Sequence, residues 1–100
     1  MRRGTTPAYS FSLPAGMHLR DFAAAYLTFA QNGHVILEKT IEELEATEEG
    51  FRFSLSQADT LGFAPGPVHI QLRARMQDGT AVASDVLSAV ALEVLRDGEI

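Results

Sequence analysis

Cysteine is absent from this chain of 100 residues, so the protein forms no disulfide and offers no thiolate to a metal ion. Small secreted domains are commonly held together by disulfides, and the absence therefore favours synthesis and use inside a reducing cell. Lysine is almost absent too: Lys39 stands alone, and 13 acidic against 8 basic residues give a net charge of −5. Because phosphate backbones are bound by clustered Lys and Arg, this balance disfavours a nucleic-acid partner.

Long apolar runs are missing as well. The longest, residues 86–92, is interrupted by Ser88 and is far shorter than the roughly 20 residues of a membrane-spanning helix. The first residues include Arg2 and Arg3, but no apolar stretch follows them, so we expect no secretory signal peptide. The sequence predicts a soluble protein without a membrane partner.

Groups that carry catalysis or bind metals do not gather in a recognised pattern. His18, His34 and His69 lack the i, i+2 or i, i+4 spacing of zinc ligands. The acidic residues between positions 42 and 49 lack the alternating ligands and fixed glycine of a calcium loop, and Asp78-Gly79-Thr80 is explained equally well by a hairpin turn. No Gly-x-Ser-x-Gly segment is present. We predict no catalytic residue, no metal site and no cofactor.

Alternation of apolar and polar residues is what the chain has in abundance. Residues 9–13, 51–55 and 68–76 each place apolar side chains at every second position, which is typical of half-buried strands. Asn32-Gly33 is a strong signal for a tight hairpin, and it predicts paired strands at Phe22–Gln31 and His34–Thr40. Asp78-Gly79 predicts a second hairpin, of type I′, after a strand at Val68–Gln77.

Several segments allow helix as an alternative. Asp21 and the alanines after it fit a helix as well as a strand. Residues 40–49 fit either a capped helix or a short strand and turn, of which we favour the strand. Residues 84–95 fit a helix, or a last strand from about Thr80 to Val94 whose phase shift near Ser84-Asp85 indicates a bulge or a change of sheet. Ser56 and Asp59 have capping-box spacing, which predicts one helical turn at residues 57–61.

Six to seven short strands with regular turns predict one all-β sandwich domain, because this chain length supports a single core. We place a flexible leader at residues 1–7, the domain at residues 8–95 and a loose tail at residues 96–100. If the three long strands share a sheet, its outer face carries residue types common at protein interfaces. The predicted interface consists of Tyr26, Thr28, Ile36, Glu38, His69, Gln71, Arg73 and Arg75. A mixed solvent-exposed face is the alternative.

The sequence also resembles small proteins encoded in phages and prophages of Firmicutes, and the immunoglobulin-like N-terminal domain of phage upper-baseplate proteins. The resemblance is carried by Tyr9-x-Phe11-x-Leu13-Pro14, Tyr26-Leu27-Thr28-Phe29-x-Gln31-x-Gly33, Leu37-Glu38-Lys39-Thr40, Phe53-Ser54-Leu55-Ser56-Gln57-x-x-Thr60-Leu61-x-Phe63, Ile70-Gln71-x-Arg73-Ala74, Asp78-Gly79-Thr80-Ala81-x-Ala83-Ser84-Asp85 and Glu93-Val94-Leu95. It spans nearly the whole chain but consists of strand and turn residues, so it transfers no functional residue.

The resemblance implies an immunoglobulin-like antiparallel β-sandwich in a non-catalytic structural or assembly protein of a virion. It implies either self-association into a homo-oligomer or docking onto other tail, baseplate or head proteins of the virion. It also implies synthesis in the cytoplasm of the bacterial host and a final location in the virion. The alternative function is a ligand-binding sandwich module for a carbohydrate or peptide. The chain has no Trp and only two Tyr residues, which disfavours glycan binding, since glycans usually stack on exposed aromatic side chains. An enzyme is the third possibility.

Overall fold

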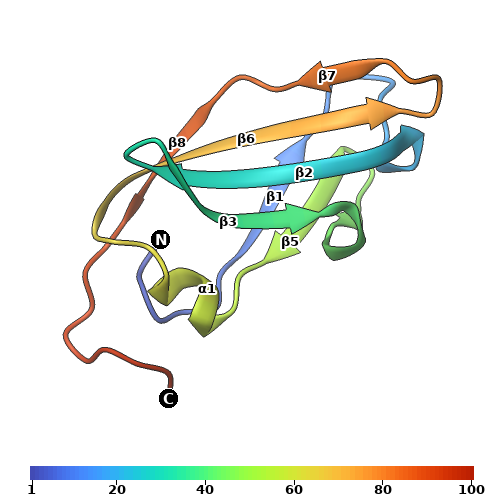
Figure 1. Cartoon of the computed structure of the whole chain (residues 1–100). Helices are drawn as coiled ribbons and strands as arrows, with labels where there is room; N and C mark the ends of the chain where they lie inside the picture. The colour runs from blue at the N-terminus through green and yellow to red at the C-terminus, as the bar shows by residue number, and fades with distance from the viewer.

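Two antiparallel sheets pack face to face in the computed structural model, which describes residues Met1–Ile100 (Figure 1). The strands are β1 (Ala8–Ser12), β2 (Phe22–Gln31), β3 (His34–Thr40), β4 (Glu45–Ala46), β5 (Gly50–Ser54), β6 (Gly66–Met76), β7 (Ala81–Ala83) and β8 (Leu87–Ala91). Short helical segments are η1 (Leu19–Asp21), η2 (Ile41–Glu43) and α1 (Gln57–Leu61). No helix combines the length and the apolar character needed to cross a membrane.

The strand order is that of an immunoglobulin-like sandwich. The larger sheet has the order β3-β2-β6-β7, with β8 on the same edge of β6 as β7, and the smaller sheet has the order β1-β5-β4. These pairings correspond to strands C′-C-F-G and B-E-D of that fold. The predicted antiparallel sandwich is therefore confirmed. The smaller sheet has no strand in the place of strand A, so β1 lies at its edge.

Both hairpins form where the sequence predicts them, but one turn differs in type. Asn32 and Gly33 have φ values of 50° and 77°, which the tight turn between β2 and β3 requires. Asp78 does not have a positive φ, whereas Gly79 has φ 92°. The Gly79 N–H donates to the Met76 carbonyl, and this three-residue connection replaces the predicted type I′ turn.

Residues 40–49 and 84–95, two of the segments that fit either strand or helix, take defined forms. Residues 41–43 form the single turn η2, in which the Glu43 carboxylate accepts from the N–H of the N-cap residue Thr40, and the two-residue strand β4 follows. The last strand is interrupted at Ser84, whose N–H donates to the Leu72 carbonyl and whose hydroxyl accepts from the Leu72 N–H. The strand resumes as β8 on the same neighbour, β6, so it has a bulge and does not change sheet. The capping box of Ser56 and Asp59 starts α1 as predicted.

The core lies between the sheets and is rich in phenylalanine. Phe29 of β2 packs edge-on against Phe53 of β5, with ring centroids 5.8 Å apart, and also lies near Phe63. Phe51 stacks on Phe11 of β1 at 4.9 Å. Aromatic pairs of this kind add to the large apolar area that each ring removes from water. The Phe29–Phe53 pair joins the two sheets, whereas the Phe11–Phe51 pair lies within the smaller sheet.

The N-terminal segment, residues 1–7, which the sequence assigns to a flexible leader, makes contacts with distant parts of the domain. Arg2 pairs in parallel with Leu92, and backbone hydrogen bonds join both neighbours of Arg2 to Leu92. The Arg3 guanidinium donates to the Phe63 carbonyl over 2.6 Å. These partners lie about 60 to 90 positions further along the chain, so no local pattern in the sequence indicates the contacts.

The tail at residues 96–100 remains on the surface but is tethered at two points. Asp97 forms an ion pair with Arg3 at 3.1 Å. The Gln57 side chain exchanges hydrogen bonds with the backbone of Ile100 at 2.8 and 3.1 Å. The Ile100 side chain is 90% exposed, so these contacts hold the tail against the domain without burying it.

Candidate protein-binding face

The outer face of the larger sheet is assembled from β3, β2 and β6, as the sequence predicted. Tyr26 of β2 lies opposite Arg73 of β6, and Thr28 lies between Gln71 of β6 and Glu38 of β3. Side chains at every second position of a strand point to the same side, so these residues share one surface. We call it the outer face. It carries Tyr26, Thr28, Glu38, His69, Gln71, Arg73 and Arg75.

Ile36 departs from the predicted set. The register of β2 and β3 shifts between Phe29 and Ala30, and Val35 comes to lie opposite Ala30. The Ile36 side chain instead lies near Gly62, the residue that follows α1. Its Cγ2 methyl group is 3.8 Å from the place that a Cβ atom of residue 62 would take. A one-residue shift moves side chains to the other face of a strand, and the alternation of residue types contains no sign of it.

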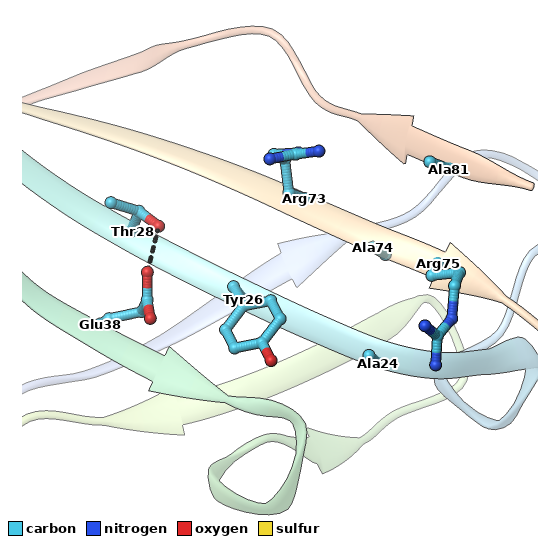
Figure 2. Close-up of a pocket in the computed structure, with 8 residues that line it drawn as sticks. All are labelled: Ala24, Tyr26, Thr28, Glu38, Arg73, Ala74, Arg75 and Ala81. Carbon is cyan, nitrogen blue, oxygen red and sulfur yellow. Dashed lines mark hydrogen bonds between the residues drawn. The ribbon is translucent and has the colours of Figure 1, made fainter.

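A shallow groove of about 540 Å³ runs across the outer face (Figure 2). Ala24 of β2 and Ala81 of β7 are short enough to leave the space open, while Tyr26 and the two arginines stand above it. Ala24 lies two positions before Tyr26 on β2 and therefore shares this face. Ala81 was missed, because only the pairing of β7 with β6 sets it opposite Arg75.

The polar groups of the outer face are unevenly satisfied. The Thr28 hydroxyl donates to Glu38 Oε2 over 3.1 Å (Figure 2). Neither Arg73 nor Arg75 forms an ion pair or a side-chain hydrogen bond, although the protein has five more negative than positive charges. Two guanidinium groups with no partner, two positions apart on one strand and beside the half-exposed Tyr26, leave this face able to bind a partner with negative charge.

The single lysine has the opposite orientation and serves the fold. Lys39 lies opposite the buried Leu27, so its side chain enters the open edge of the sandwich, where its Nζ contacts Asp59 Oδ2 at 2.9 Å and Glu43 Oε2 at 3.3 Å. Only 12% of the Lys39 side chain and 19% of the Asp59 side chain are exposed. This pair joins β3 to the first turn of α1. The sequence prediction missed it, since the two residues lie 20 positions apart.

The pKa values of this pair shift in the directions that ion pairing requires. Burial lowers the pKa of Lys39, but hydrogen bonds and attraction from Asp59 and Glu43 outweigh it, so the pKa lies above its usual value. Burial raises the pKa of Asp59, but hydrogen bonds from Ser56 and Lys39 and the lysine charge hold it below its usual value. Asp78 also has a lowered pKa, because Thr80 donates to it within the hairpin turn. The side chains with shifted pKa values stabilise a hairpin turn and a helix cap, and none of them lines the groove.

The Lys39–Asp59 pair predicts a pH window of stability. The lowered pKa of Asp59 contributes stability that is present above pH ~4 and is lost as the pH falls through the folded-state pKa. The raised pKa of Lys39 contributes stability that is present below pH ~10.5 and is lost as the pH rises through the folded-state pKa. We expect Asp59→Asn to lower the free energy of unfolding at pH 7 by about 1–2 kcal/mol and to flatten its dependence on pH at both ends. Urea unfolding between pH 2.5 and 11 measures this. Asp85→Asn removes a carboxylate without an ion pair and should leave both ends unchanged; equal profiles for the two variants would contradict the assignment.

The described residues contain no group of three or more His, Asp or Glu side chains placed to share a metal ion. Comparisons with protein-family models, with curated proteins and with solved structures found no match. The function proposed for the chain therefore rests on its own residues, and above all on the groove and the unpaired arginines of the outer face.

Proposed function

We propose that this protein is a non-catalytic assembly module that binds a protein partner through the outer face of its larger sheet. One observation carries the proposal: Arg73 and Arg75 have no partner within the chain, and they stand with Tyr26 over a groove on a rigid sheet. Arg and Tyr are enriched among the residues that dominate protein interfaces, because each combines a large contact area with directional hydrogen bonds.

The partner surface should be acidic, and the chain itself offers one. Glu42, Glu45, Glu48 and Glu49 are exposed around η2 and β4, at the far end of the sandwich from the C-terminal tail. Docking this acidic segment onto the outer face of a second copy brings different surfaces together. Such a heterologous contact generates rings or filaments. The module therefore fits self-association into a homo-oligomer.

A structural protein of a phage or prophage is the setting that we propose for such a module, on the strength of the sequence resemblance to phage upper-baseplate domains. Repeated contacts between copies and with other virion proteins are what tail, baseplate and head assembly require. The chain would be made in the host cytoplasm and incorporated into the virion. Capsid, portal or tail genes beside its gene would support this setting, and a metabolic operon would contradict it.

A carbohydrate-binding or peptide-binding module is the second candidate, and the groove is the observation that favours it. Tyr26 is the single aromatic side chain on the outer face, whereas sugar rings commonly stack on several. Binding of a protein partner through the arginines therefore accounts for more of this surface.

We expect the double variant Arg73→Glu/Arg75→Glu to abolish self-association. It reverses the charge of the outer face, and like charges placed opposite one another at an interface cost several kcal/mol. Light scattering and sedimentation at about 100 µM should show oligomers for the native chain that weaken with rising salt. Arg20→Glu/Arg96→Glu makes the same change in net charge at exposed positions elsewhere and should leave the oligomer intact. A strictly monomeric native chain would contradict self-association.

A further inference from the structure

The two sheets differ in width, and the difference leaves a slot along one side of the sandwich. At this side β1 ends the smaller sheet, while β7 and β8 extend the larger sheet beyond it. The slot between them has a volume of about 430 Å³. Its lining is mainly apolar and comes from both sheets, with Phe11 and Leu13 on one side and Leu72, Val82 and Leu87 on the other.

The edge of β1 that borders the slot has unpaired backbone groups. The Leu13 N–H donates to the Glu49 carbonyl, and the Pro7 carbonyl accepts from the Leu55 N–H. Since facing residues of antiparallel strands alternate between hydrogen-bonded and unbonded pairs, the odd-numbered residues of β1 bond to β5. The N–H and C=O groups of Ala8, Ser10 and Ser12 then point away from β5. An exposed strand edge of this kind is ready to pair with another strand.

The facing edge of the larger sheet is unusually apolar for an exposed segment. Leu87 lines the slot and is 47% exposed. Leu87 lies opposite Ile70 and so belongs to the inner side of the sheet, but no strand of the smaller sheet covers it. The N-terminal segment pairs with this strand only at its far end, where Met1 and Arg3 bond to Leu92 and the Met1 amino group donates to the Val90 carbonyl. The edge before that point is free.

We propose that this slot binds an extended segment of a different protein as an added strand beside β1. An extended chain satisfies the free groups of β1, and apolar side chains at alternate positions fill the space over Val82 and Leu87. The occupant should also carry a lysine or arginine, because Asp85 is the one charged residue that lines the slot and it has no ion-pair partner. This site is separate from the outer face and does not depend on the function proposed for that face.

The test uses a synthetic peptide of about eight residues, alternating valine and threonine with arginine at one end, and the full chain. We expect the peptide to raise the melting temperature and to protect the amides of Ala8, Ser10 and Ser12 from hydrogen exchange. Ser10→Pro removes an N–H that bonds to nothing in β5, and proline is tolerated at such an edge position. It should weaken peptide binding at least about tenfold. Ser10→Ala keeps the N–H and should bind as the native chain does.

Three further results decide the inference. Val82→Lys places a charge in the lining without touching β1, and it should weaken peptide binding even if Ser10→Pro proves unstable. Arg73→Glu/Arg75→Glu should bind the peptide normally, which separates this site from the outer face. Unchanged affinity in both Ser10→Pro and Val82→Lys would overturn the proposal. Loss of self-association in Ser10→Pro would overturn it as well, because the occupant would then be a second copy of this chain.

Discussion

Gly50→Ala is expected to lower the free energy of unfolding by about 4 kcal/mol or more, which is a large part of the total stability of a small domain. Gly50 begins β5 opposite Ser12 of β1. A Cβ atom at this position would lie 2.0 Å from the Phe11 carbonyl oxygen and 2.9 Å from the Leu13 nitrogen. Both are backbone atoms of β1, so no side-chain rotation relieves the contact, and the two strands would have to separate.

Urea unfolding followed by circular dichroism measures this effect, and Gly16→Ala is the matched control. Gly16 has φ 82°, and no atom lies within 4 Å of the place that a Cβ would take, so alanine there meets only the backbone penalty of about 1 kcal/mol. Equal stability losses in the two variants would show that β1 and β5 do not approach as closely as the structure has them. A larger loss at Gly50 confirms the contact.

Gln31→Ala is expected to cost about 2–3 kcal/mol, the second largest effect. Gln31 ends β2 on the inner face and is only 6% exposed. Its amide nitrogen donates to the carbonyls of Ala64 and Pro67 at 2.8 and 3.2 Å, and its amide oxygen accepts from the Ala64 N–H at 2.9 Å. The side-chain amide thus makes the hydrogen bonds that the backbone of a neighbouring strand would make. Its loss leaves a cavity and three backbone groups without a partner.

Gln77→Ala provides the control, because Gln77 is an exposed residue of the same type whose side chain makes one hydrogen bond, to the Phe22 carbonyl at 3.3 Å. Its replacement should change the free energy of unfolding by less than about 0.5 kcal/mol. Thermal and urea unfolding compare the two variants. Equal losses in the free energy of unfolding for Gln31→Ala and Gln77→Ala would contradict the assignment. Water would then have to reach the end of β2 and replace the amide, although the structure shows this site as buried.

Local patterns predicted the strands and the turns well. The alternation around Tyr26 and Arg73 was enough to place both on one face, because strand geometry alone decides which side chains share a side. Asn32-Gly33 and the Ser56–Asp59 capping box also specify their turns from neighbouring residues. The type of the Asp78-Gly79 turn was predicted wrongly, since the same two residues fit more than one hairpin length.

Features that depend on distant partners were not accessible from the sequence. Nothing near Lys39 indicates that it reaches Asp59, and nothing near Arg3 indicates its bond to the Phe63 carbonyl. The displacement of Ile36 from the outer face follows from a register shift between two strands, which depends on how the strands pair.

By itself, the sequence determined the all-β class, the strand and hairpin positions and the residues on most of the outer face, because these follow from a two-residue period and from turn chemistry. Only the tertiary structure decided the unequal widths of the two sheets, the slot beside β1 and the absence of partners for Arg73 and Arg75. The first two depend on which edges remain unpaired after folding, and the third depends on which acidic side chains the fold brings within reach of the arginines. An edge is defined by all the strands together, and no single segment of the chain encodes it.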